Sequence, residues 1–548
     1  MRLLPNAWLR RLGAGALLAL AAVPMLWTAL EALKTGSHPA AWRALAQDPA
    51  LTHAALLTLW TGLASTLLAW WGAAALLARG FVRQRLARLL RGLPVMLATP
   101  HAALAIGFLF LLAPSGWLLR ALSPWLTGFD SPPPWPTTQD PWGLGLIAAL
   151  VIKEIPFLLW TAATQLQRDD VRQRWRAEHA LAQTLGYPPR RAFWLVLWPQ
   201  LATRLRWPLL AVLAYGLTVV DMALVIGPAS PPTLAALAWQ WLQDADPATY
   251  AQGAAAGVLL ALMVLACSVL WLGAQHLQRL MLAHGRGVRG AAAPTPGGDI
   301  GVWLLVGVYV AVLLALAVGS VSGVWAFPSV WPQGFTTAAW AQVAQSSATV
   351  FTTLWLAAGS SAVALVWSVA WLELAPRRWD DALRPVLYLP LVLPAVLWVV
   401  GLYGVGLQLR LEGRAAGLLL AHTLMVLPYT LLTLSPAYLG FDARYAQLNA
   451  SLGHGTWRFL WCVKWPLLKR SIASTAAVGF AVSVAQYLPT LYLGAGRYAT
   501  VTTEAVTLAS GGQRSLTSAY AALQFALPVL AFALAAWWGR PRRFKMPA

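Results

Sequence analysis

Charged residues are scarce in this chain of 548 residues, where only 10% are Asp, Glu, Lys or Arg. A soluble domain usually carries about 25% charged residues, so the composition excludes a soluble enzyme, a disordered protein and a nucleic-acid-binding domain. Acidic residues are the scarcer kind, with 18 against 39 Lys and Arg and a net charge of +21. Because 59% of the residues are apolar, the sequence predicts a polytopic membrane protein.

Residues that carry chemistry are also few. The two cysteines, Cys267 and Cys462, exclude a disulfide framework and a thiolate metal cluster. None of the five Lys residues follows Gly, so the chain lacks the phosphate-binding GxxxxGK[ST] loop and does not hydrolyse ATP by that route. Neither HExxH nor GxSxG occurs. We therefore predict no catalytic residue, no metal ligand and no cofactor held by this chain.

Long apolar runs are what the sequence has instead. A bilayer core of about 30 Å needs roughly 20 apolar helical residues, and a span must satisfy its own backbone hydrogen bonds. The sequence predicts an all-α polytopic membrane protein with twelve transmembrane helices. The runs cover residues 12–33, 54–78, 90–113, 143–164, 207–229, 252–273, 301–323, 347–373, 385–407, 415–437, 472–494 and 518–538.

The basic residues predict the orientation of these runs. With the N-terminus inside the cell, 31 of the 39 Lys and Arg residues fall in cytoplasmic segments, 7 fall outside, and Lys153 lies within a span. By the positive-inside rule, both termini are cytoplasmic. The same charges also suit contact with anionic lipid headgroups. Arg residues precede the first run, as in a signal peptide, but its length and its counterpart at 301–323 favour a retained span.

The sequence contains two copies of one unit. The motif Thr58-Leu59-Trp60 returns as Thr353-Leu354-Trp355, and residues 182–201 align without a gap on 449–468, with eight of the twenty positions identical. Two parallel six-helix repeats are thus expected, with a pathway at their interface. The predicted organisation is a first six-span repeat at 1–274, a cytoplasmic linker at 275–300 and a second six-span repeat at 301–548.

The largest cytoplasmic loop of each repeat has a pattern of its own. In the second copy Phe441, Tyr445, Leu448 and Leu452 fall on one helical stripe, and Gly453 follows at the place of a C-cap glycine. This predicts a helix, a Gly turn and a short helix ending near a proline, which favours a docking surface over a simple helix cap. The candidate docking residues are Leu185, Gly186, Arg191, Pro199, Leu452, Gly453, Arg458 and Pro466.

With these loops the chain resembles the permease subunits of ABC importers that work with a periplasmic binding protein. Gly186 with Pro199, and Gly453 with Pro466, match the Gly and Pro of that family's loop motif, whose Glu position holds Ala180 and Gln447 here. The resemblance covers nearly the whole chain. It is strongest to the fused double permeases of ferric-iron, thiamine and related importers.

The resemblance implies a set of partners and a location. Each loop would dock on a separate ATP-binding subunit, so two copies are expected, and these subunits would bind ATP and Mg. A periplasmic solute-binding protein would deliver a small solute, and no nucleic acid is involved. The chain would be a multi-pass protein of the bacterial inner membrane. Ferric iron, thiamine, a polyamine and an anion all remain open as substrates.

Polar groups inside the spans are candidates for pathway or gating roles, because a charge there costs roughly 2.5–3.5 kcal/mol on insertion scales. An alternative is a buried ion pair of Lys153 with Asp221 or Glu154 that fixes helix packing. A hydrogen-bonded packing role is the alternative for His422. The candidates are Lys153, Glu154, Asp221, His422 and Gln486.

The outside loop at 114–141 is rich in Pro and Trp. Part of it, Trp117 to Leu126, suits an interfacial helix. The loop is either a platform for a binding protein or an anchor among lipid headgroups, and the sequence leaves both open.

A twelve-span secondary transporter driven by an ion gradient is the competing function. The commonest such fold carries a Gly-x-x-x-Asp motif between its second and third spans, where this chain has Gly80 without the Asp. The largest cytoplasmic loops also lie within each half, not between the halves. Both observations favour the ABC permease.

Overall fold

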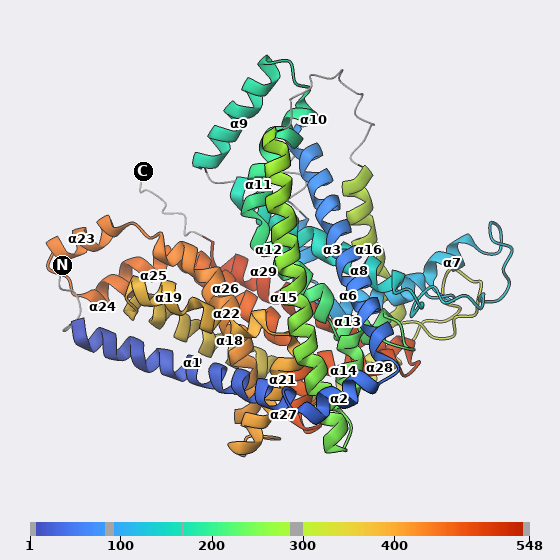
Figure 1. The fold of residues 1–548 in the computed structure, drawn as a ribbon. Coiled ribbons are helices and arrows are strands. Elements are labelled where there is room, and N and C mark those ends of the chain that lie inside the picture. Colours follow the sequence, from blue (N-terminus) through green and yellow to red (C-terminus); the bar gives the residue numbers. More distant parts are fainter. Residues whose placement is uncertain (1–6, 83–91, 167–168, 285–299, 541–548) are drawn as a thin grey trace, which may run out of the picture. The chain divides into compact units, whose positions relative to one another are not determined.

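The computed structural model describes residues 7–82, 92–166, 169–284 and 300–540 (Figure 1). Apart from a single bridge between Ser322 and Phe335, the regular structure of these residues is helical. The predicted all-α class is therefore confirmed. The chain divides into two compact units, one formed by His38–Ala339 and Ala509–Ala519, the other by Met1–Ser37, Trp340–Leu508 and Tyr520–Ala548. We call them the first-half unit and the second-half unit.

The first-half unit contains the helices α2 to α16. They are α2 (Pro39–Gln47), α3 (Leu51–Val82), α5 (Leu93–Ala98), α6 (His101–Leu112), α7 (Trp117–Leu122), α8 (Leu144–Leu166), α9 (Asp169–Thr184), α10 (Pro189–Ala192), η1 (Phe193–Leu197), α11 (Trp198–Arg204), α12 (Arg206–Thr218), α13 (Asp221–Ile226), α14 (Leu234–Leu242), α15 (Pro247–His284) and α16 (Ile300–Ser320).

The second-half unit contains α1 and most of the chain after α16. Its helices are α1 (Ala7–Gly36), α17 (Ala338–Gln345), α18 (Ser347–Leu374), α19 (Arg377–Leu387), α20 (Leu389–Val392), α21 (Ala395–Gln408), α22 (Ala415–Leu439), α23 (Ala443–Ser451), α24 (Thr456–Phe459), η2 (Leu460–Lys464), α25 (Trp465–Leu467), α26 (Lys469–Val484), α27 (Leu488–Gly494), α28 (Val501–Ala509) and α29 (Arg514–Trp538), with the ends of α17, α28 and α29 assigned to the other unit.

The first helix of each half packs in the unit of the other half. Helix α1 runs along α21 so closely that a Cβ at Gly401 would overlap the carbonyl of Thr28. In the same way α16 runs along α6, where Gly107 makes room for the side chain of Val312. The compact units therefore differ from the sequence repeats by an exchange of their first helices.

Nine helical segments of the described residues are long and apolar enough to cross a membrane. A tenth candidate is the pair Thr456–Leu467 and Lys469–Val484, which is bent by 74°. The expectation of a polytopic membrane protein is thus confirmed, whereas four of the twelve predicted runs are not continuous helices. These four are the runs at 90–113, 207–229, 385–407 and 472–494.

Two of the interruptions have proline at the break. Pro100, in an extended conformation, separates α5 from α6, and Pro394, with φ −52° and ψ 136°, separates α20 from α21. Proline cannot donate to the preceding turn, and it pushes the residue before it out of the helical region. In the run at 207–229 the helix breaks at Val219, also extended, and α13 begins at Asp221. Hydropathy alone does not register these breaks, because the residues on both sides are apolar.

The core of the second-half unit lies among α18, α22 and α26. Trp367 and Trp371 stack with ring centroids 5.5 Å apart. Small residues bring the backbones together, since a Cβ at Gly479 of α26 would meet Ser361 of α18. Close packing through small residues is typical of membrane helices.

Candidate functional site

The two large loops predicted to be cytoplasmic have the same backbone around their glycines. In each, a helix (α9 or α23) ends at a glycine with positive φ, +89° at Gly186 and +72° at Gly453. A short helix, a π-helical turn and another short helix follow, at residues 189–204 and 456–467. Every one of these following elements begins 267 residues after its counterpart. The predicted helix, Gly turn and short helix are confirmed in both loops.

The π-helical turns were not predicted. The N–H of Trp198 donates to the carbonyl of Phe193, and the N–H of Trp465 donates to that of Leu460. In both loops the next residue is proline, whose ring would clash with the carbonyl four residues earlier in a regular helix. The wider turn accommodates the ring. The proline spacing was therefore the signal in the sequence, and such turns are frequent at functional sites.

Apolar side chains of the loops face outward. Leu448 and Leu452 are 59% and 63% exposed, and the aligned Leu181 and Leu185 are 61% and 51% exposed. Tyr445 extends the stripe of the second loop, where its partner in the first loop is Glu178. Of the basic candidates, Arg458 is exposed and Arg191 is half-buried. Pro199 and Pro466 each occupy the second position of a short helix.

The first loop is held by bonds within itself. Trp175 Nε1 donates to Gln200 Oε1 at 3.1 Å, and Gln200 Nε2 donates to Glu178 Oε2 at 2.7 Å. Arg174 Nε pairs with the same carboxylate at 2.7 Å. These bonds, led by that from Gln200, hold the pKa of Glu178 below its ordinary value. The network ties α9 to α11.

The second loop is held to the long helices. Lys464 Nζ lies 2.6 Å from Glu373 Oε2 at the end of α18 and 3.9 Å from the centroid of the Tyr438 ring. Tyr438 donates to Glu373 at 2.9 Å and accepts from Trp465 Nε1 at 3.2 Å. Arg10 donates to the carbonyl of Glu373 at 2.8 Å. A cavity of about 310 Å³ lies beside this cluster, lined in part by Arg10, Glu373, Tyr438 and Lys464.

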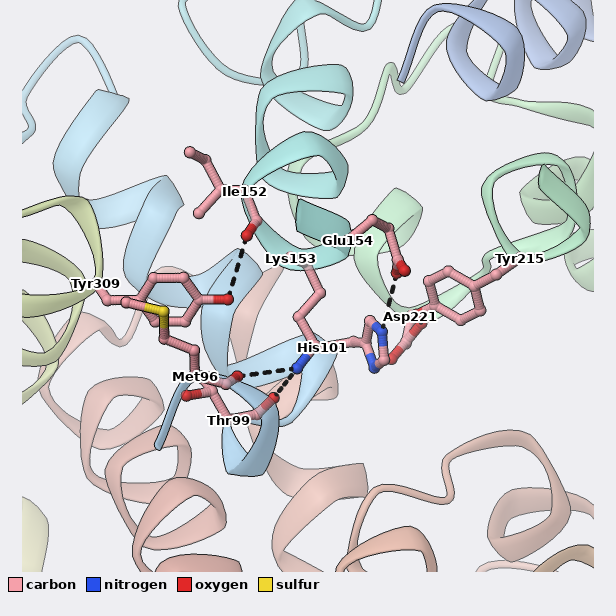
Figure 2. A network of polar contacts seen from close by, with 9 residues as sticks. All are labelled: Met96, Thr99, His101, Ile152, Lys153, Glu154, Tyr215, Asp221 and Tyr309. Carbon is pink, nitrogen blue, oxygen red and sulfur yellow. Dashed lines mark hydrogen bonds and ion pairs between the residues drawn. The ribbon is translucent and has the colours of Figure 1, made fainter. Parts of the chain in front are cut away.

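The charged candidates of the first half gather where α5, α6, α8 and α13 meet (Figure 2). Lys153 donates to the carbonyl oxygens of Met96, at 3.4 Å, and Thr99, at the break before α6. Glu154 points the other way, toward His101, with 3.5 Å between Oε1 and Nε2. The two neighbours thus serve different faces of α8. Among the described residues, neither of the ion pairs considered for Lys153 is present.

His101 belongs to this cluster but is not among the candidates that the sequence provides. Its ring lies between Glu154 and Asp221 in Figure 2, with its centroid 4.4 Å from that of Tyr215. Tyr215 Oη donates to Asp221 Oδ1 at 3.4 Å. The signal was its position directly after Pro100, because the first residue of a helix beyond a break faces the polar groups of that break.

The polar cluster of the second half is uncharged. His422 is 1% exposed, and its two ring nitrogens lie 2.8 Å from Ser483 Oγ and 2.9 Å from Thr490 Oγ1. Gln486 donates to the carbonyl of Val482 one turn earlier, at 3.3 Å. The helix that begins at Asp221 has its counterpart beginning at Leu488. The carboxylate therefore has no equivalent in the second half, and His422 has the contacts of a packing residue.

Neither cluster has the donor set of a metal centre. The described residues contain no group of three or more His, Cys, Asp or Glu side chains arranged to hold a metal ion. The chemistry available to the charged cluster is electrostatic, with two carboxylates and one imidazole beside a fixed ammonium group. The chemistry of the loops is recognition, through exposed leucines on a fixed backbone.

Comparison with known proteins gives a relative over the full length. The chain is 34% identical over 543 residues to the inner membrane ABC transporter permease protein YnjC of Escherichia coli, covering 96% of this chain and 97% of the relative. The thiamine transport system permease protein ThiP of Salmonella typhimurium is 30% identical over 36% of this chain and 38% of its own length. The molybdenum transport system permease protein ModB of Mycobacterium tuberculosis is 35% identical over 21% and 48%. No family model matches the chain.

Proposed function

The chain belongs to the ABC transporter permeases, and we propose that as an importer subunit it forms the complete solute pathway between its two repeats. The relative covers both repeats, at 97% of its own length. One chain would then supply what two separate permease subunits supply elsewhere. In this proposal all twelve runs cross or enter the membrane, with the broken ones as kinked spans and both termini in the cytoplasm.

The duplicated loop is the observation that supports coupling of this chain to an ATP-binding subunit. Two segments with the same backbone expose leucines at the same positions, 267 residues apart. An exposed apolar stripe on a rigid helix is the usual contact of a helix that docks into a groove. Two such stripes call for two copies of one partner. That partner is the ATP-binding subunit, which holds ATP and Mg, since this chain has no phosphate-binding loop.

The remaining partners follow from the class of importer. A periplasmic binding protein would deliver a small solute to the outer face of a multi-pass protein in the bacterial inner membrane. The ThiP and ModB relatives are thiamine and molybdenum permeases by name, and each covers less than half of this chain. The substrate is therefore left at the level of a small solute. The charged cluster and its neutral counterpart around His422 would act as packing and gating elements of the pathway.

Co-purification tests the proposal. The chain is tagged at its C-terminus, extracted from native membranes in mild detergent, and its stoichiometric partners are identified by mass spectrometry. We expect an ATP-binding protein at two copies per chain. A chain that purifies alone, and that carries solute in liposomes under an ion gradient, would instead be a secondary transporter.

A further inference from the structure

Two segments of the first-half unit join into one body beside the helices. The first follows α6 and contains α7, and the second follows α16 and folds back on itself, with Gly323 N–H donating to the carbonyl of Gly334 at 2.9 Å. Trp117 Nε1 joins them by donating to the carbonyl of Val330 at 2.8 Å. We call residues 114–137 together with 321–335 the aromatic foot.

A buried arginine holds the aromatic foot together. Arg120 of α7 is 3% exposed, and its guanidinium donates to the carbonyls of Ala326, Ser329 and Trp325 at 2.8, 2.9 and 3.0 Å. The guanidinium carbon also lies 4.9 Å from the Trp325 ring centroid. Four or more fixed contacts on one planar group make the two segments a single rigid piece. The charged guanidinium of Arg120 is therefore buried inside the foot, where backbone carbonyls accept its hydrogen bonds, and it is not at the surface of the foot.

The surface of the aromatic foot is apolar and almost uncharged. Its two segments contain only Arg120 and Asp130 as charged residues, and of these Asp130 alone is exposed. The large exposed apolar side chains include Trp125 at 74%, Leu126 at 63%, Trp135 at 53%, Trp331 at 59% and Phe335 at 67%. A patch of this kind marks a membrane or protein contact, and the lack of charge decides between them.

We propose that the aromatic foot inserts into the membrane–water interface, so that its partner is the headgroup and upper acyl region of the lipid. A docked protein would require a polar rim with hydrogen bonds, and the two segments expose only three polar side chains, Asp130, Ser131 and Gln333. Tryptophan is the residue that membrane interfaces enrich. The indole N–H of Trp125 donates to the carbonyl of Ala121 at 2.9 Å, so its ring can enter the lipid without an unmet donor.

The position of the aromatic foot agrees with a lipid partner. The second segment continues from α16, which is apolar and long enough to span the membrane, and the first continues from α6, whose candidate span His101–Leu122 runs on into α7. Helix α16 exposes Leu304, Val310 and Leu314, so this side of the unit faces lipid. In Figure 1 the foot, with α7, extends sideways from α6 and α16. A sideways extension from lipid-facing helices meets the membrane interface.

The two segments of the foot contain no basic residue other than the buried Arg120, and this predicts how insertion depends on lipid charge. Attraction to anionic lipid needs Lys or Arg near the surface, at about 1 kcal/mol each. The two segments themselves expose neither, and the exposed Arg514 of α29 meets the foot at Ser115, to which it donates a hydrogen bond. Its insertion should depend on buried apolar area alone. The depth of the foot is therefore expected to be the same in neutral vesicles and in vesicles rich in phosphatidylglycerol.

Depth-dependent quenching tests the proposal on the full chain. Leu126→Cys is introduced into a chain that carries Cys267→Ala and Cys462→Ser, and the new cysteine is labelled with an environment-sensitive fluorophore. The labelled chain is reconstituted in phosphatidylcholine vesicles with 0 or 30% phosphatidylglycerol, a range on the order of natural membranes. Lipids spin-labelled near the headgroup should quench the label more than those labelled near the chain end. The exposed Ala248→Cys in the first turn of α15 is the control, and iodide in water should quench it several-fold more strongly.

Two results would overturn the proposal. In the first, iodide quenches the label at position 126 as strongly as the control. In the second, the label is shielded only when a purified solute-binding protein is added, which would make the foot a protein platform. Equal lipid quenching at both phosphatidylglycerol contents supports insertion through apolar area, and loss of quenching at 0% contradicts it. Because position 126 is largely exposed, the cysteine variant leaves the core intact.

Discussion

Thr58 Oγ1 accepts a hydrogen bond of 2.7 Å from the N–H of Leu234, the first residue of α14, across 176 positions of the chain. The second half repeats the bond, with Thr353 Oγ1 accepting from Val501 at 2.9 Å at the start of α28. The first N–H groups of a helix have no acceptor within the helix, so a buried N–H at this end needs an acceptor from another part of the chain. The repeated Thr-Leu-Trp motif therefore marks a long-range helix cap.

Removing either threonine acceptor should destabilise the protein. Thr58→Val and Thr353→Val keep the shape but leave a buried N–H unmet, so each should lower the free energy of unfolding by about 1–3 kcal/mol. Tryptophan fluorescence during heating in detergent measures the loss. Thr164→Val is the control, because Thr164 is exposed and bonds only within its own turn. Equal unfolding temperatures for all three variants would show that the bond does not stabilise the fold.

The Gly turns of the docking loops should not accept a branched side chain. A β-branched residue is strained at φ values of +89° and +72°, so Gly186→Val and Gly453→Val should tilt the following short helix. ATP-driven uptake is expected to fall several-fold while the ATPase still hydrolyses ATP. Gly455→Ala is the control, with a negative φ and open space around it. Unchanged uptake in both valine variants would contradict a role of these turns in coupling.

A charge in the exposed stripe should release the ATPase subunit. Leu185→Asp and Leu448→Asp place a carboxylate where an apolar contact is expected, and desolvating it would weaken docking by about 2 kcal/mol or more. The amount of ATPase that co-purifies with the tagged chain measures the effect. Gln447→Asp adds the same charge on an exposed neighbour and should retain the partner. Release by Gln447→Asp to the same extent would show that net charge, and not the stripe, controls docking.

The first docking loop should lose stability in acid. Its hydrogen bonds hold the pKa of Glu178 below the ordinary value of 4.5. A carboxylate of this kind stabilises the native state above its unfolded pKa, and the contribution is lost as pH falls through the lower native pKa. Glu178→Gln should therefore destabilise the loop at pH 7 and match the original chain once the pH has fallen below the lowered native pKa of Glu178. Hydrogen exchange of α9 measures this, and a difference that persists in acid would exclude the carboxylate as its source.

The sequence predicted most of the long apolar helices for physical reasons. Hydropathy reflects contact with lipid, which is a local property of each apolar run. Eight of the twelve predicted runs are accordingly continuous helices in the structure. The loop backbone around Gly186 and Gly453 was also predictable, because glycine and proline act on their immediate neighbours. The same reasoning did not place the break at Val219, which depends on how α13 packs against α6 and α8.

The partners of the buried polar residues were beyond sequence reasoning. Spacing on α8 showed that Lys153 and Glu154 face different sides, yet nothing in the sequence brings His101 next to Glu154. Carbonyls freed by the break after Thr99 attract the lysine, and such acceptors are invisible in a residue pattern. The exchange of α1 and α16 was missed for a related reason, since a repeat describes ancestry and not packing.

The ion pair between Lys464 and Glu373 should make the two docking loops unequal. The aligned residue of the first loop is Leu197, and that loop is tied within itself through Gln200. A push on the second loop is therefore passed to α18 through an ion pair, whereas the first loop meets α3 through aromatic packing, with Trp198 against Trp70 and Phe193 against Phe81. Lys464→Met leaves Glu373 half-buried without its partner, at a cost of about 1–3 kcal/mol, and should reduce uptake per ATP hydrolysed.

The reciprocal exchange separates this role from simple destabilisation. Glu373→Lys combined with Lys464→Glu restores an attractive pair at the same site and should recover much of the uptake per ATP that either single variant loses. Gln200→Leu in the first loop gives the comparison, because it removes an internal tie without touching a long helix, so uptake per ATP should change little. If Gln200→Leu and Lys464→Met lower that ratio equally, the loops transmit alike and the ion pair has no special part in coupling.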